Sequence, residues 1–133
     1  MHPDTYARVA LSRVPNIGPK LFRALVAYFG SATAVLRARP QELGAVVGVG
    51  DRTAAYFQQD DHRREAEGIL DHAARNDIDI LCCLDEGTFP GRLWPHPTAP
   101  PILYHFGATD FSNPRTLAVV GTREMSPQGG RQI

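Results

Sequence analysis

An apolar segment followed by a glycine-containing loop, close to the last residue of the sequence, has residue types suited to binding phosphate. The segment Leu117–Val120 holds two valines in four apolar residues, which predicts a short buried strand. Gly121 and Gly129 would let the backbone approach an anion, Thr122 would offer a hydroxyl, and Arg123 would supply a forked cation that matches phosphate oxygens. The alternative interpretation is a strand, then a turn with one solvated arginine.

Two turns earlier in the sequence share a second pattern. Each places an apolar residue before a glycine, Gly18 or Gly50, and follows it two residues later with a cation, Lys20 or Arg52. This spacing resembles paired helix-hairpin-helix turns, in which N–H groups at the start of a helix bind a DNA phosphate. The first turn has Asn16 where a glycine is usual, and asparagine tolerates the positive φ that this position needs. The alternative is that both turns only pack a small helical bundle.

Acid–base or nucleophilic catalysis finds little support in the sequence. No nucleophile or carboxylate accompanies His96 at a spacing typical of a catalytic site. Asp85 and Glu86 are adjacent in a turn, which is a poor arrangement for paired acid–base catalysis. Glu124 is the only carboxylate near the phosphate-type loop. We therefore predict no catalytic residue, no metal ligand and no cofactor.

The periodicity of apolar residues predicts the elements that would position these groups. Asp4 is the expected N-cap of the first helix, Pro19 the first residue of the second, and Ser31 the cap of the third. Fourth and fifth helices follow Pro40 and Asp51. The full expectation is helices from Asp4 to Val14, Pro19 to Phe29, Ser31 to Leu36, Pro40 to Val47, Asp51 to Phe57 and His62 to Arg75, with strands at Ile78–Cys83, Ile102–Phe106 and Leu117–Val120.

The sequence has 133 residues, of which 43% are hydrophobic and 21% charged, and this composition is typical of a globular domain. Formal net charge is zero, but residues 1–59 carry seven Lys/Arg against three Asp/Glu, a mild excess that suits either nucleic acid or a solvated surface. No apolar run approaches the ~20 residues of a membrane span, and no signal-peptide layout is present, so we expect a cytoplasmic location. Cys82 and Cys83 are adjacent in an apolar run and are expected to be buried, reduced thiols.

The order of three further motifs carries a resemblance to a known family. Asp85–Leu93 is an acidic loop with a Phe-Pro pair, Pro100–Gly107 contains Pro-Pro and an Ile-Leu-Tyr strand, and Val120–Arg123 reads Val-Gly-Thr-Arg. In this order they resemble the DNA-processing protein A family, called DprA or Smf, from about Ala7 to Gly130. The helical segment before them is similar to the SAM-like region that begins members of the family.

The resemblance implies an α+β chain: an all-α SAM-like, helix-hairpin-helix-like domain over residues 1–60, then the opening part of a Rossmann-like α/β domain over residues 61–133. It implies a protein that binds and protects single-stranded DNA and helps load RecA in natural transformation and recombination. The implied partners are single-stranded DNA, RecA and a second copy of the chain, with no membrane. Because a strand-loop-helix phosphate site needs the helix after Gly130, we also expect the sequence to be a fragment.

Two other functional classes stay open at this stage. Rossmann-like phosphate loops also serve nucleotide-processing enzymes, and such an enzyme would hydrolyse nucleotides. A helix-hairpin-helix accessory domain of a repair protein would instead prefer duplex DNA to single strands.

Overall fold

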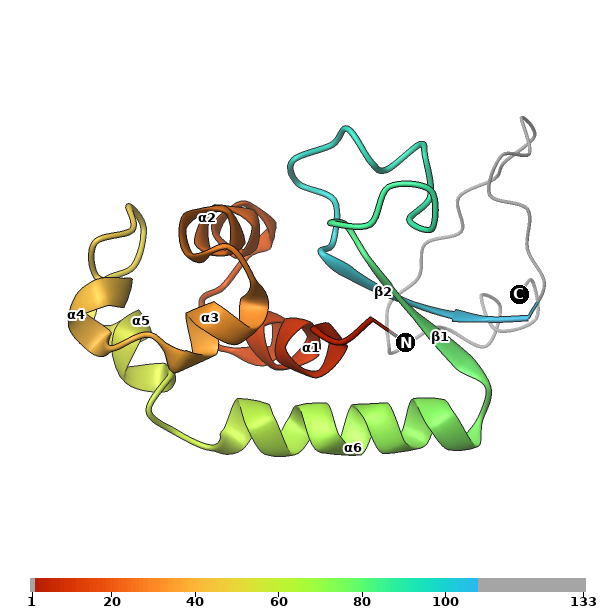
Figure 1. The fold of residues 1–133 in the computed structure, drawn as a ribbon, viewed down its shortest axis with the longest axis horizontal. Coiled ribbons are helices and arrows are strands. Elements are labelled where there is room, and N and C mark those ends of the chain that lie inside the picture. The colour runs from red at the N-terminus through yellow and green to blue at the C-terminus, as the bar shows by residue number, and fades with distance from the viewer. Residues whose placement is uncertain (1, 108–133) are drawn as a thin grey trace, which may run out of the picture.

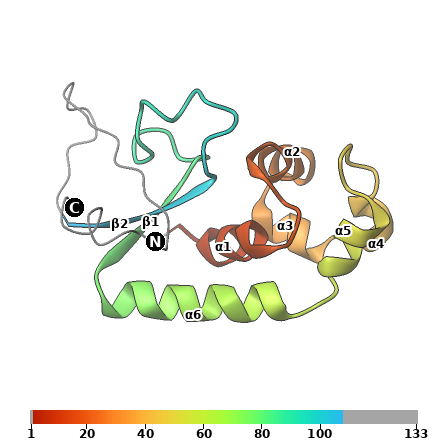
Figure 2. The ribbon, with the colours of Figure 1, turned by 180° about the vertical axis from the view of Figure 1, so that it is seen from behind.

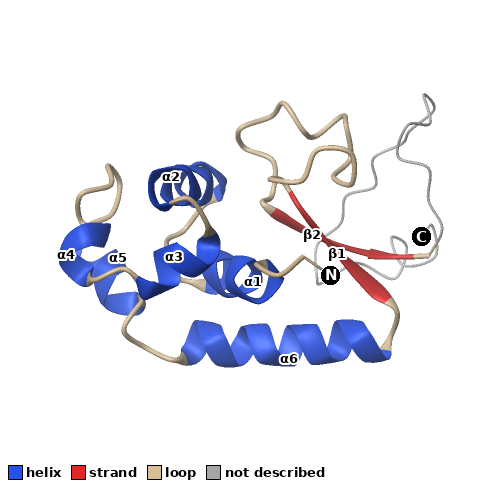
Figure 3. Ribbon diagram, in the orientation of Figure 1, coloured by secondary structure: helices blue, strands red, loops and turns tan. Residues whose placement is uncertain are grey.

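The computed structural model describes residues 2–107. Six helices are followed by two strands, as Figures 1 and 3 show. The elements are α1 (Thr5–Arg13), α2 (Pro19–Phe29), α3 (Ala32–Arg37), α4 (Pro40–Leu43), α5 (Asp51–Tyr56), α6 (Asp61–Arg75), β1 (Ile78–Cys82) and β2 (Ile102–Phe106). The predicted α+β class is confirmed.

Helix α2 begins and ends where the sequence predicts. Pro19 occupies the first turn, where its missing N–H costs nothing, and Gly30 ends the helix with a left-handed φ of 95°. Its apolar stripe enters the core, since Phe22 and Leu25 have no exposed surface. The next helix, α3, is capped as predicted by Ser31, whose Oγ accepts a hydrogen bond from the Ala34 amide at 3.1 Å.

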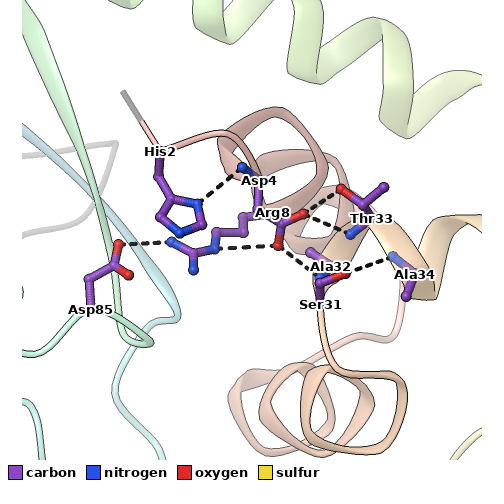
Figure 4. Close-up of polar contacts among 8 residues, drawn as sticks. All are labelled: His2, Asp4, Arg8, Ser31, Ala32, Thr33, Ala34 and Asp85. Atoms are coloured by element: carbon purple, nitrogen blue, oxygen red, sulfur yellow. Dashed lines mark hydrogen bonds and ion pairs between the residues drawn. The ribbon is translucent and has the colours of Figure 1, made fainter.

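Asp4 does not play its predicted role. It precedes α1, but its side chain makes no capping hydrogen bond to that helix. Its carboxylate instead accepts hydrogen bonds from the amides of Ala32 and Thr33 at the start of α3, both at 2.9 Å (Figure 4). The reason is tertiary, because packing of α1 against α3 brings the unpaired amides of α3 within reach of Asp4.

The stretch between α4 and α5 also differs from the prediction. Helix α4 ends at Leu43, four residues before the expected Val47, because Gly44 is a poor helix former and Gly48 adopts a φ of 101°. The N-cap of α5 is Gly50, and the predicted cap, Asp51, lies in the first turn.

Helix α6 and the sheet follow each other directly. The helix ends at Asn76 as predicted, and Asp77 turns the chain with a φ of 53°. β1 and β2 pair antiparallel, from Ile78 opposite Phe106 to Cys82 opposite Ile102. The apolar run Ile78–Cys83 predicts a strand of the buried type, and this is wrong for β1, since Asp79 is exposed and Ile78 is half-buried. Leu117–Val120, the third expected strand, lies outside the described residues.

A hydrophobic core joins the helices to the sheet and to the loop between the strands. Phe22 and Leu25 of α2 belong to one cluster with Cys82 of β1 and Phe89 of the loop. A second cluster forms where α6 packs against α1, around Val9, Ala10 and Ala66. Seen from behind, α6 runs beneath α1 and continues into β1 (Figure 2). Helix α6 therefore contacts both the helical bundle and the sheet.

Candidate nucleic-acid interface

The turn between α1 and α2 has the backbone of a hairpin that exposes the start of a helix. Asn16 adopts a φ of 69°, as its replacement of glycine predicts. Gly18 is the N-cap with φ −87° and ψ −178°, and its carbonyl accepts from the Phe22 amide at 2.9 Å. Ile17 is half-buried between them and packs on the main core. The turn therefore holds Gly18 rigidly while leaving it exposed.

The turn between α4 and α5 repeats this geometry 32 residues later. Gly48 takes the positive φ, at 101°, and Gly50 is an N-cap with φ −88° and ψ 176°. The Gly50 carbonyl accepts from the Ala54 amide at 2.9 Å, and buried Val49 takes the place of Ile17. The sequence resemblance between the two turns is thus matched, residue for residue, in backbone conformation.

The two turns lie next to each other in space. A Cβ placed on Gly48 would meet Cδ1 of Leu21, in the first turn of α2, at 3.5 Å. A Cβ on Gly18 or Gly50 would meet nothing within 4 Å, so both backbones are open to approach by a ligand. The arrangement brings two exposed helix starts together on one side of the bundle, which suits consecutive phosphates of one backbone.

Charge on this surface is modest and uneven. Lys20 and Arg52 are both exposed, each in the first turn of its helix. Asp51 shares the first turn of α5 with Arg52 and is also exposed, and its carboxylate opposes an incoming phosphate. The α2 start, where the first turn has no acidic residue, is therefore the more favourable of the two for an anion.

The predicted phosphate loop cannot be compared with the structure. Gly121, Thr122, Arg123 and Gly129 all lie outside the described residues. Gly18, Lys20, Gly50 and Arg52 lie within the described residues, on the two neighbouring turns, and their contact with DNA stays a prediction.

Comparisons with known proteins address both halves of the sequence. The family described as the DprA-like N-terminal HHH domain matches residues 2–67. The family described as DNA recombination-mediator protein A matches residues 80–133. The chain belongs to the DprA/Smf family. The predicted resemblance is confirmed, and the described turns lie within the first matched region.

One curated relative shows how much of a DprA/Smf protein this sequence represents. Protein Smf of Synechocystis sp. (strain ATCC 27184 / PCC 6803 / Kazusa) is 28% identical over 128 residues, which are 92% of this chain and 32% of the relative. The chain thus spans about a third of the length of that protein. No solved structure matches the chain.

Sequence reasoning missed two arginines that connect the two matched regions. Arg8 of α1 is buried, and its Nη1 donates to Asp85 Oδ2 at 2.8 Å, as Figure 4 shows. Arg23 of α2 donates to the carbonyls of Pro97 and Ala99, both at 3.2 Å. Neither residue carries a signal in the sequence, because each partner lies more than 70 positions away.

Other groups considered in the sequence fit structural roles. His96 is exposed and contributes its carbonyl, not its ring, to Arg23. Cys82 and Cys83 are buried and unbridged, as predicted. Among residues 2–107, no three His, Cys, Asp or Glu side chains come close enough to hold a metal ion. No helix in this part of the chain has the length and apolar character that a membrane crossing requires.

A cavity bordered by described residues lies between α1, α6 and β1. It has a volume of about 770 Å³ and its walls are mostly apolar, with Leu70, Ile78 and Ile80 among them. Arg8 and Asp85 also line it, already paired with each other. We assign no substrate to this cavity.

Proposed function

We propose that this chain contacts DNA through the sugar-phosphate backbone, as part of a recombination mediator that binds and protects single-stranded DNA and helps load RecA. The observation that carries the proposal is the matched pair of turns, with Gly18 and Gly50 open and Lys20 and Arg52 exposed beside them. Contacts to phosphate carry no base information, which suits a protein that must accept any sequence. The family description of residues 80–133 as a DNA recombination mediator supports the same role.

Within this proposal the phosphate-type loop is the main single-strand site. Arg123 would bind phosphate, Gly121 and Gly129 would allow close backbone approach, and Thr122 would add a hydroxyl donor. The paired turns would provide a secondary contact. Dimerisation, RecA binding and cytoplasmic location are part of the proposal for the longer protein and rest on family membership.

The first test is fluorescence anisotropy of the chain with labelled oligo-dT and with a duplex of equal length, at low and moderate salt. We expect salt-sensitive binding that favours the single strand. In the full-length protein, Arg123→Ala should weaken binding across all sequences and reduce the magnitude of the salt slope by about one phosphate contact. An unchanged affinity in this variant would remove Arg123 from the site.

A second comparison isolates the paired turns. Lys20→Ala should reduce the salt slope by about one, and Arg52→Ala by less because Asp51 already lowers the local potential. Arg64→Ala is the matched control, since it removes an exposed charge from α6, which contains neither turn. Equal effects of all three substitutions would mean that the turns make no specific contact.

A duplex-binding accessory domain is the competing function, and the side-by-side turns are the observation that favours it. Preference for duplex, retained in Arg123→Ala and lost in Lys20→Ala, would support that function against the first. Among the described residues no such observation favours an enzymatic role.

A further inference from the structure

Residues 85–101 form most of the loop between the two strands, and side chains of α1 and α2 contact this loop. Within the loop, backbone hydrogen bonds join residues three or four apart, such as Phe89 N–H to Asp85 O at 3.1 Å and Trp94 N–H to Pro90 O at 3.1 Å. These local bonds shape the loop but do not attach it to the helices. Its attachment must come from side chains.

The first attachment is at the start of the loop. Arg8 Nη1 donates to Asp85 Oδ2 at 2.8 Å, and the Arg8 side chain is only 9% exposed. Arg8 also forms an ion pair with Asp4, with Nε 3.6 Å from Asp4 Oδ2. The same Asp4 carboxylate accepts hydrogen bonds from the start of α3 (Figure 4). The Arg8 side chain thus joins Asp4, by an ion pair, to Asp85, by a hydrogen bond.

The second attachment is at the end of the loop. Arg23 Nη1 donates to the carbonyls of Pro97 and Ala99, each at 3.2 Å, and Nη2 reaches the His96 carbonyl at 3.5 Å. Nη1 also lies 3.1 Å from the Pro19 carbonyl at the start of the same helix. A guanidinium presents several N–H donors in a fixed plane, so one side chain satisfies several carbonyls of the loop at once.

Apolar contact fills the span between the two arginines. Phe89 is buried in the main core, and Leu93 and Trp94 are half-buried against it. The Phe89 and Trp94 rings meet edge-on, with centroids 6.5 Å apart. Trp94 is the single tryptophan of the sequence, so its fluorescence reports on this loop alone.

We propose that Arg8 and Arg23 form a two-point clamp that holds the 85–101 loop on the helical bundle, and that the loop opens as one unit when the clamp is released. The clamp joins the two regions matched by the family descriptions, residues 2–67 and 80–133. It is a conformational device that goes beyond the proposed DNA-binding function and does not depend on it. Local segments can open at a lower free energy than global unfolding, and here opening also separates Phe89, Leu93 and Trp94 from the core.

Hydrogen exchange of the whole chain tests the clamp. In Arg8→Met and in Arg23→Met, loop amides such as those of Phe89, Trp94 and Ala99 should exchange roughly tenfold faster, the factor expected from one charge-assisted hydrogen bond. The slowest amides of α2 and α6 should accelerate much less. In the Arg8→Met background, Asp85→Asn should add little, because the pair is already broken.

Arg37→Met is the matched control, since Arg37 is exposed at the end of α3 and should leave the exchange of the loop unchanged. Equal acceleration of loop and helix amides in the clamp variants would overturn the proposal, because it would mean that the loop has no opening of its own. No acceleration in either variant would overturn it as well.

Lysine variants and Trp94 fluorescence extend the test if a methionine variant does not fold. Arg23→Lys keeps the charge but loses the fork, so acrylamide should quench Trp94 more strongly than in the parent chain while the helical circular dichroism stays the same. Unchanged quenching in both Arg8→Lys and Arg23→Lys would contradict the clamp.

Discussion

At the scale of single residues, Asp4 combines capping and charge. Burial by itself raises the pKa of the Asp4 carboxyl, but hydrogen bonds from the Thr33 hydroxyl and from the amides of Ala32 and Thr33, together with Arg8, outweigh burial and lower the pKa. A lowered folded pKa means that the charged carboxylate stabilises the fold.

We predict that Asp4→Ala lowers the free energy of unfolding by about 2 kcal/mol, because the amides at the start of α3 lose their acceptor and the buried Arg8 loses a nearby opposite charge. The contribution is fully present above the unfolded pKa of about 4 and is lost as pH falls through the lower folded value. Urea denaturation at pH 7 and at pH 3 measures both effects. Asp4→Asn keeps an acceptor without the charge, and a loss equal to that of Asp4→Ala would show that charge dominates.

His62 carries a second pH dependence of a different origin. The side chain is buried at the start of α6, its ring meets Phe57 at a centroid distance of 6.1 Å, and its Nε2 has no hydrogen-bond partner among residues 2–107. Burial lowers the pKa of His62, and Arg63 lowers it further, against the opposing effect of nearby acidic residues.

We predict that stability decreases as pH falls below about 6.5, the unfolded pKa of histidine, until the folded pKa is reached, because the unfolded chain takes up the proton first. His62→Leu should flatten the profile between about pH 7 and pH 5. The matched control is His96→Leu, which removes an exposed histidine. If the stability of His62→Leu changes as steeply with pH as that of the parent chain, other groups cause the pH dependence.

At the scale of elements, the two hairpin turns depend on one backbone torsion each. Asn16 at 69° and Gly48 at 101° occupy the left-handed region, which residues with a branched or bulky Cβ enter at a cost. The Cβ that Gly48→Ala would add meets Leu21 at ordinary contact distance, so the strain comes from the torsion and not from a clash.

We predict that Asn16→Ala and Gly48→Ala each lower the free energy of unfolding by about 1–2 kcal/mol, and that Asn16→Gly is neutral or slightly stabilising. Gly18→Ala is the control, because Gly18 has a φ of −87° and open space around it, so this substitution introduces no left-handed strain and costs only the N-cap preference of Gly over Ala. Thermal denaturation followed by circular dichroism separates these outcomes. A neutral Gly48→Ala would show that the turn relaxes.

At the scale of the whole molecule, α6 links the stability of the helical region to that of the sheet, because it packs against both. The sequence places a domain boundary near residue 60, with α6 on the side of the sheet. In the structure Val9 and Ala10 of α1 are fully buried in a cluster with Ala66 of α6, and α6 also contacts β1. The boundary itself stays a prediction.

We predict that a chain of residues 1–60 is less stable than one of residues 1–75 by at least about 2 kcal/mol, because Val9 and Ala10 lose their cover. Chemical denaturation of the two chains measures the difference. Equal stability would support an independent helical domain that ends at residue 60.

Local pattern alone determined much of this protein. Proline restricts φ, whereas glycine and asparagine tolerate turn conformations, so the sequence predicts the limits of α2, the end of α6 at Asn76 and the positive φ of Asn16. The repeated spacing around Gly18 and Gly50 likewise predicts two equivalent helix starts.

The tertiary structure decided what depends on partners far apart in the sequence. Asp4 caps α3 and not α1, Arg8 finds Asp85, and Arg23 finds the carbonyls of residues 96–99. The exposure of β1 was also misjudged, because an apolar run does not reveal which face a neighbouring element covers. A side chain with several possible acceptors takes the one that packing brings within about 3 Å, and that choice is made only when the helices and the loop come together.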